Sequence, residues 1–326
     1  MDSTVVAQIQ KQYEKRSSES LIGLKINLYT HYEVEAVSDA FRLLREDDIY
    51  YSPDCFMIGD SFLTTHLGYG STKLSTPTEQ SFFFKVMCEL VYEVKSSVEH
   101  LFVGEAKPFI VADMPDGSTC DNLTATKNAE QLIKFGADVI KIEVASSKAL
   151  SIVENLCRQG ILVMAHIGYT PQTSENRLYG SSLEEVLDIF NLARQLRDCG
   201  ISSLVIERVA EIVNQSLCVN RENSLPVYSI FSGKSPFGGQ SLNVWDSVFL
   251  PPFQARFFPP TAKYGIEKYP EMYSRQIITQ HFTELLRLTI LGDYPLSPPQ
   301  KLSFEDIEKI RSINPWKNDS CVQKIT

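Results

Sequence analysis

The sequence predicts an α/β fold, a (β/α)8 barrel of the TIM type with a helical extension at its C-terminal end. Short apolar runs rich in β-branched residues recur along the chain, and amphipathic stretches with helical periodicity separate them. Strands that are apolar on both faces and joined through helices form a parallel sheet that is covered on both sides. An open doubly wound sheet is the alternative, but no Gly-x-Gly-x-x-Gly motif follows the first strand.

Seven apolar runs are predicted to be strands, and a weaker run, QARFF at 254–258, is the candidate for the eighth. The helical stretches between residues 128 and 200 each end in glycine, as helices commonly do. The predicted strands span 24–31, 55–60, 109–114, 138–144, 161–167, 203–209 and 226–231.

The remaining segments frame this barrel. Residues 1–23 are predicted to form a lead-in helix and residues 24–258 the barrel itself. Residues 259–302 hold proline-rich turns around one long amphipathic helix, and residues 303–326 are expected to be a peripheral, charged tail.

Composition excludes several classes of function. The chain has 31 Lys and Arg against 40 Asp and Glu, a net charge of −9, which disfavours binding to nucleic acid or to an anionic membrane. Its apolar runs are far shorter than the roughly 20 residues that span a bilayer, and no secretory leader is visible. The seven scattered cysteines include no C-x-x-C pair, which fits a reducing compartment, so a cytoplasmic location is expected.

Polar residues stand at or just past the ends of five predicted strands. The carboxyl ends of barrel strands meet on one face, where the chemistry of such folds takes place. Taken singly, each residue also has a structural explanation, such as a turn cap, a loop acid, an ion pair or a core histidine. These residues are Asp60, Asp113, Glu143 with Lys141 before it, His166 and Glu207.

Several carboxylates that meet at a barrel rim repel one another unless they are paired or bind a cation. Oxygen ligands favour Mg²⁺ or a similar hard ion, and a zinc site is poorly supported. Such an ion could chelate a 2-oxo acid and stabilise its enolate, with Glu207 as the candidate base and Lys141 neutralising charge on the substrate.

The order of short motifs along the chain resembles that of the ketopantoate hydroxymethyltransferase family, over roughly residues 10–300. Each motif is short, and the resemblance depends on their common order. The motifs are KINLYTHYE (25–33), MIGDS (57–61), LGYGST (67–72), FIVADMP (109–115), GADVIKIE (136–143), AHIGYTPQ (165–172), GISSLVIERV (200–209), LPVYSIFSG (225–233), GGQSLNVWD (238–246) and GDYPLSPP (292–299).

This resemblance implies a metal-dependent barrel that forms a large homo-oligomer, a decamer in the family. It also implies transfer of a one-carbon unit from 5,10-methylenetetrahydrofolate to 3-methyl-2-oxobutanoate, giving ketopantoate for pantothenate biosynthesis. The family's site residues are matched position by position. Asp60 and Asp113 would bind Mg²⁺ directly and contact the substrate, Glu143 would complete the metal site, Ser61, Lys141 and His166 would hold or line the substrate, and Glu207 would be the base.

The chain departs from the family pattern in loops expected to contact substrate. Val144 and Ala145 replace a glycine pair, residues 173–182 replace a glycine-rich loop, Asp116 stands where the family tends to have an aromatic residue, and Phe231 fills a position that the family leaves open. The acceptor could therefore be another 2-oxo acid, and the donor need not be a folate. Two further functions stay open: a lyase or mutase of the phosphoenolpyruvate mutase and isocitrate lyase group, and a catalytically silent oligomeric scaffold.

Overall fold

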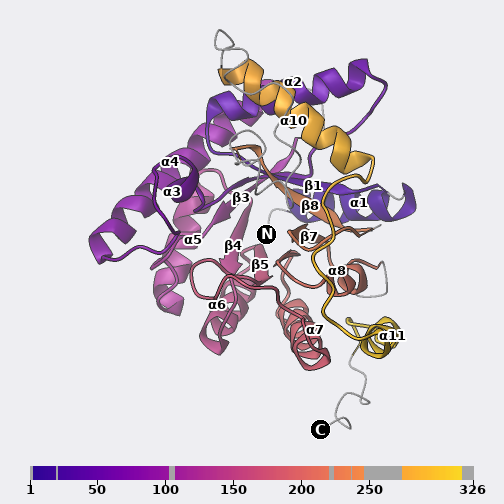
Figure 1. The fold of residues 1–326 in the computed structure, drawn as a ribbon. Helices are drawn as coiled ribbons and strands as arrows, with labels where there is room; N and C mark the ends of the chain where they lie inside the picture. Colours follow the sequence, from indigo (N-terminus) through magenta and orange to yellow (C-terminus); the bar gives the residue numbers. More distant parts are fainter. Residues whose placement is uncertain are drawn as a thin grey trace.

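Eight parallel strands close into a barrel with helices arranged around it (Figure 1). The computed structural model describes residues 3–19, 21–102, 107–219, 224–235, 237–245 and 274–317. Its strands are β1 (Gly23–Asn27), β2 (Cys55–Ile58), β3 (Phe109–Asp113), β4 (Val139–Glu143), β5 (Val163–Gly168), β6 (Ser203–Glu207), β7 (Val227–Ile230) and β8 (Gly239–Asn243). The predicted barrel is confirmed, and each of the seven predicted strands contains one of β1 to β7 or most of it.

Several of the helices that connect and flank these strands begin or end at capping residues. Thr76 accepts a hydrogen bond at the start of α4, and Gly136, with φ 118°, ends α5 in the left-handed conformation. The described helices are α1 (Ser3–Glu19), α2 (His31–Glu46), α3 (Phe62–Thr65), α4 (Pro77–Leu101), α5 (Asn122–Phe135), α6 (Ser147–Arg158), α7 (Leu183–Asp198), α8 (Glu211–Cys218), α10 (Ser274–Ile290) and α11 (Phe304–Ser312).

The eighth strand was predicted in the wrong place. The barrel closes through β8, which pairs with β1 from Gly23 opposite Gly239 to Asn27 opposite Asn243. The run at 254–258 lies outside the described residues. β8 does not form an apolar run, because its sequence, GQSLN, is polar. Its two inward-facing residues near the site, Ser241 and Asn243, line the pocket described below.

Alternate residues of each strand face the barrel interior, as the two-residue period of a strand requires. On β3, Phe109 and Val111 belong to the interior cluster, whereas Ile110 and Ala112 pack outward against the helices. The same parity places Asp113 inside, one step closer to the carboxyl end of the strand. The interior is therefore apolar over most of its length and polar at one end.

Helix α1 closes the opposite, amino-terminal end of the barrel. Its Val5 and Ile9, four residues apart on one helix face, join the same apolar cluster as the interior side chains. Gln8 also donates a 2.5 Å hydrogen bond to the carbonyl of Lys107, just before β3. The polar end of the barrel is consequently left as the open one.

The C-terminal segments pack on the outside of the barrel. In Figure 1, α10 lies along α2, where Arg275 donates to Asp39 and Glu35. The stretch expected to be a peripheral tail contains α11, which contacts α7 and α8, and the Trp316 side chain is buried with its ring N–H donating to the Leu217 carbonyl. Among the described residues, none of the helices is long and apolar enough to cross a membrane.

Candidate active site

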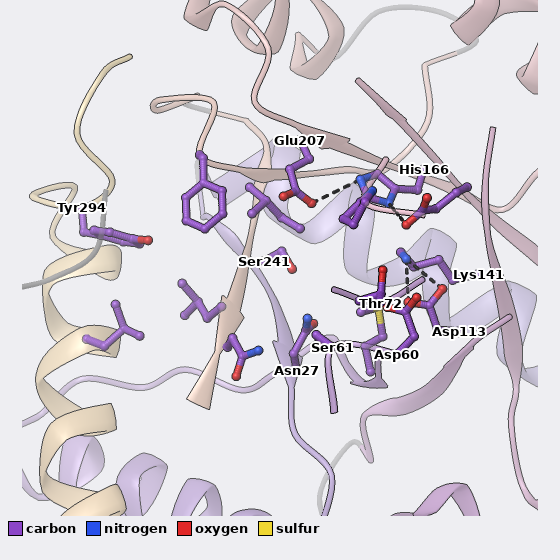
Figure 2. A pocket seen from close by; sticks show the side chains of 18 residues that line it. Asn27, Asp60, Ser61, Thr72, Asp113, Lys141, His166, Glu207, Ser241 and Tyr294 are labelled. Atoms are coloured by element: carbon purple, nitrogen blue, oxygen red, sulfur yellow. Dashed lines mark hydrogen bonds and ion pairs between the residues drawn. The ribbon is translucent and has the colours of Figure 1, made fainter. Parts of the chain in front are cut away.

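One cavity of about 130 Å³ opens at the carboxyl ends of the strands, large enough for a small molecule and not merely for a single water. All of the predicted site residues line it, although they lie as far apart in the chain as Asp60 and Glu207. Figure 2 shows them converging from several strands. The lining residues are Asn27, Met57, Asp60, Ser61, Thr72, Asp113, Lys141, Glu143, His166, Pro171, Glu207, Ile230, Phe231, Ser241, Leu242, Asn243, Leu285 and Tyr294.

A buried ion pair joins neighbouring strands on one wall. Asp113 on β3 lies opposite Lys141 on β4, and the Lys141 Nζ donates to both carboxylate oxygens of Asp113, at 2.8 and 2.7 Å. Both side chains are almost fully buried. The sequence left open a simple pair between Lys141 and Glu143 on one strand, and the structure pairs the lysine across strands instead.

Gln172, in the loop after β5, ties two further carboxylates together. Its side-chain amide donates to Asp60 Oδ2 at 2.8 Å, and its backbone N–H donates to Glu143 Oε2 at 3.0 Å. The same side-chain amide reaches the carbonyl of Met114 at 3.0 Å. Gln172 thus holds Asp60 and Glu143 toward the same cavity as Asp113.

This wall carries more negative charge than its lysine balances. Burial and the adjacent Asp113 carboxylate raise the pKa of Asp60 to about 7. Burial, with Asp60 and Asp113 adding to it, also raises the pKa of Glu143 well above its ordinary value, although Lys141 opposes the shift. Burial by itself lowers the pKa of Lys141, but the carboxylates of Asp113, Glu143 and Asp60 outweigh it and the net shift is upward.

His166 lies between two of the carboxylates. Its Nε2 is 3.4 Å from Glu207 Oε2, and its Nδ1 is 4.0 Å from Glu143 Oε1 (Figure 2). Burial, reinforced by the positive charges of Lys141 and Lys25, lowers the pKa of His166 well below its usual value, so the ring is neutral at physiological pH. The histidine therefore separates Glu207 from the other three acids without adding charge.

The donor set of this wall fits a hard divalent cation. Asp60, Asp113 and Glu143 offer oxygen ligands of the kind that Mg²⁺ binds, and burial together with the neighbouring carboxylates raises the pKa values of Asp60 and Glu143, a shift that a bound cation would oppose. Within the described ranges, no three His, Cys, Asp or Glu side chains lie close enough together, as they stand, to hold a metal ion, so the three carboxylates would have to move toward a bound cation. Both oxygens of Asp113 are occupied by Lys141, so a cation would have to share them with the ammonium group.

Ser61 owes its position to a chain of hydrogen bonds that the sequence reasoning missed. The Asn243 side-chain amide donates to the Tyr29 hydroxyl at 2.9 Å, and the Tyr29 and Ser61 hydroxyls are 2.7 Å apart. The Asn243 carbonyl oxygen is held in turn by the backbone N–H of Trp245 at 3.0 Å. The signal that could have revealed Asn243 is its inward parity on β8, a strand predicted elsewhere.

The positions at which the chain departs from the family pattern have distinct roles. Phe231 lines the cavity at the end of β7, and its backbone has a φ of 50°, a left-handed conformation that is costly for a bulky residue. With Ile230, Leu242, Leu285 and Tyr294 it makes the apolar side of the pocket. Asp116 accepts a 2.9 Å hydrogen bond from the backbone of Leu74 and so ties two loops together near the site.

The chain is similar to proteins of one enzyme family. A sequence model of that family, described as ketopantoate hydroxymethyltransferase, matches residues 23–284. A 3-methyl-2-oxobutanoate hydroxymethyltransferase of Ignicoccus hospitalis is 30% identical over 270 residues, which cover 81% of this chain and 88% of the relative. The enzyme of the same name from Thermosipho melanesiensis is 33% identical over 210 residues, covering 63% and 73%.

Among solved structures, a Burkholderia cenocepacia J2315 protein described provisionally as a lyase/mutase aligns with a TM-score of 0.52. The alignment covers 86% of this chain and 97% of the other at 10% identity. At that identity the likeness extends to the fold alone.

Proposed function

Because this chain belongs to the ketopantoate hydroxymethyltransferase family, we propose that it adds a hydroxymethyl unit, drawn from 5,10-methylenetetrahydrofolate, to a 2-oxo acid such as 3-methyl-2-oxobutanoate. The family and the enzyme class predicted from the sequence, a hydroxymethyltransferase, are confirmed by the match. The observation that carries the proposal is the convergence of Asp60, Asp113, Glu143 and Lys141 on one side of a cavity whose other acid is Glu207.

We assign the metal role to the wall with excess negative charge. Asp60, Asp113 and Glu143 would hold Mg²⁺, which when bound would supply a Lewis acid for the keto group of the substrate. Lys141 adds a permanent positive charge beside Asp113, where it would offset charge that develops on the substrate oxygen. Ser61, oriented through Tyr29, would hydrogen-bond the bound acid.

Glu207 is the proposed base. It stands across His166 from Glu143, and the neutral imidazole keeps it apart from the carboxylates assigned to the metal. In its ionised form Glu207 would accept the proton from C3 of the 2-oxo acid, and C3 would then bond to the methylene carbon of the donor. The two bonds from that carbon to the folate nitrogens would break, water would supply the hydroxyl oxygen, and tetrahydrofolate would leave. The subunits are proposed to form a homo-oligomer, as the family resemblance implies.

Proton exchange tests this assignment without the one-carbon donor. The protein is incubated with Mg²⁺ and 3-methyl-2-oxobutanoate in D2O, and loss of the C3 proton is followed by NMR. We expect exchange that requires Mg²⁺ and falls by about 10²-fold or more in Glu207→Gln, in line with loss of a general base. Glu154→Gln, which changes a surface pair with Arg158 on α6, is the matched control and should exchange normally.

Absence of exchange with every 2-oxo acid tried would contradict the enolising role and favour the silent scaffold. Undiminished exchange in Glu207→Gln would assign the base to another group. Adding 5,10-methylenetetrahydrofolate to the active protein then tests the donor, because transfer would deplete the acceptor and form the hydroxymethylated acid.

A further inference from the structure

A second polar group lies in the pocket where β1 and β8 meet. It is separate from Asp60, Asp113, Lys141 and Glu143, which we call the acidic wall. Lys25 and Asn27 on β1 and Ser241 on β8 face the barrel interior, and Ser241 lies opposite Lys25 in the register, two positions before the pair of Asn27 and Asn243. The fully buried Lys25 Nζ donates to Asn27 Oδ1 and to Ser241 Oγ, both at 2.7 Å. We call these three residues the lysine-backed floor.

The lysine fixes which hydrogen-bonding atoms the floor presents to the cavity. Because Lys25 Nζ donates to both residues, Asn27 turns its carbonyl oxygen toward the lysine and its NH2 group away from it, and the Ser241 oxygen accepts while its proton is left to donate elsewhere. In the part of the chain that the structure describes, neither the Asn27 Nδ2 nor the Ser241 hydroxyl proton has a protein acceptor. The floor thus offers two donors beside the buried Lys25 side chain.

Thr72 is a further unsatisfied group on the same cavity. Its hydroxyl oxygen is buried and finds no hydrogen-bond partner among the described residues. Buried polar groups are normally hydrogen-bonded, and an exception inside a binding cavity calls for a partner that comes with the ligand. Figure 2 draws Thr72 beside Lys141, where the head group of a bound acid could supply its partner, so the two donors of the floor are what point to further oxygen atoms on the ligand.

The floor lacks an acceptor for its two donors, and this indicates which ligand group would bind there. A hydroxyl group on the ligand would bring a donor that also needs an acceptor, whereas a carboxylate is an acceptor only and matches two donors and a cation. Burial lowers the pKa of Lys25 to about 7 against the opposing pull of Cys55, Asp113 and Glu207, and an anion seated above it would favour its charged form.

The floor also lies where the tail of a bound acid would pass. In Figure 2, Asn27 and Ser241 appear between the pair formed by Lys141 and Asp113 on one side and Tyr294 on the other. A 2-oxo acid whose head group is held at Lys141 and Ser61 would extend its side chain along this surface.

Building on the proposed function, we propose that the acceptor of this enzyme is a 2-oxo dicarboxylic acid, whose second carboxylate binds the Asn27 amide and the Ser241 hydroxyl above Lys25. The site thereby selects against acceptors with a purely alkyl side chain, which would displace water from both donors without replacing its hydrogen bonds.

Calorimetric titration with two probes of similar length tests the floor directly. In the presence of Mg²⁺, wild-type protein should bind 2-oxopentanedioate at least tenfold more tightly than 2-oxohexanoate. Asn27→Asp keeps the side-chain shape but places a negative charge on the floor, and it should abolish this preference while changing binding of 2-oxohexanoate less than threefold. Ser241→Ala should reduce the preference several-fold and serves as a second variant where Asn27→Asp fails to fold.

The matched control is Asn155→Asp on α6, whose amide contacts Thr126 outside the barrel, and which should keep the wild-type preference. An unchanged ratio of the two affinities in Asn27→Asp and Ser241→Ala would overturn the proposal. Equal weakening of both probes would also overturn it, because it would place the common 2-oxo acid head on the floor.

Proton exchange at C3 of 2-oxopentanedioate separates this proposal from the function on which it rests. Exchange that depends on Glu207, together with no preference for the dicarboxylate, would contradict the proposed carboxylate site at the floor but support the proposed enzyme function. A strong binding preference for the dicarboxylate without any exchange at C3 would support the proposed carboxylate site at the floor but contradict the proposed enzyme function.

Discussion

The two sides of the pocket differ in how their polar groups are held. The acidic wall, at the ends of β2 to β4, carries carboxyl groups held by Lys141 and Gln172, whereas the side built by β1, β7 and β8 carries amides, hydroxyls and apolar side chains backed by the buried Lys25. On the first side the raised pKa of Asp60 marks unrelieved charge. On the second, the described residues give donors such as Asn27 Nδ2 no protein acceptor, which leaves them open to a ligand. The acidic wall is thus suited to a cation and the other side to part of an organic ligand.

The largest effect is expected from breaking the ion pair of the acidic wall. Lys141→Met leaves the Asp113 carboxylate buried without its partner, which should lower the free energy of unfolding by about 3 to 5 kcal/mol. Urea denaturation measures the change. The control is Lys95→Met, which removes more exposed contacts to Glu99 and Asp138 and should cost about 1 kcal/mol or less.

Adding Asp113→Asn to Lys141→Met should restore part of the stability, because the unpaired charge is then gone. Equal losses for Lys141→Met and Lys95→Met would show that the acidic wall is as well hydrated as the surface, and the contrast between the two sides would fail.

A smaller effect is expected from the pH dependence of the metal-free protein. The folded chain holds the Asp60 proton up to about pH 7, whereas the unfolded chain releases it near the ordinary value of 3.8. The folded state therefore binds more protons between these values, and its stability should fall as pH rises from about 4 to about 7, by about 1 to 3 kcal/mol.

Asp60→Asn removes this titration, so the difference in unfolding free energy between the variant and wild type should widen in favour of the variant across the same pH range. Chemical denaturation at four or more pH values checks this result. Parallel curves for the two proteins would contradict it. Mg²⁺ should flatten the wild-type curve, because a bound cation favours the ionised carboxylate.

The smallest effect is expected on the side built by β1, β7 and β8. There a series of hydrogen bonds runs from Asn243 through Tyr29 to Ser61. Tyr29→Phe removes one hydroxyl and should weaken acceptor binding by about 0.5 to 1.5 kcal/mol, seen as a rise in KM of several-fold with kcat nearly unchanged. Tyr51→Phe, which removes a hydroxyl that contacts the Ile22 backbone, is the matched control. A fall in kcat at constant KM would instead assign Tyr29 a part in the chemical step.

Much of this arrangement could be predicted from the sequence because barrels repeat a simple pattern. Apolar runs at regular spacing located seven strands, and acids at strand ends identified Asp60, Asp113, Glu143 and Glu207 as neighbours. The eighth strand was missed for the opposite reason. Ser241 and Asn243 occupy inward positions that the rule for buried strands expects to be apolar, and their polarity belongs to the pocket.

Other features depended on partners that no local pattern identifies. Gln172 is a loop residue whose reach to Asp60 spans 112 positions of the chain. The register between β3 and β4 paired Lys141 with Asp113, although Glu143 is closer in sequence. No local pattern distinguishes Lys25 in the sequence. Closure of the barrel pairs it with Ser241, to which it donates a hydrogen bond.

The sequence by itself determined the class of fold, the family and the acids of the site, because strand period, helix period and the placement of charges at strand ends are local properties of the chain. Only the tertiary structure decided which charge pairs with which, which hydroxyls are oriented and which donors stay unpaired. Those outcomes depend on strand register and barrel closure, which bring together residues between 28 and 216 positions apart and bury them.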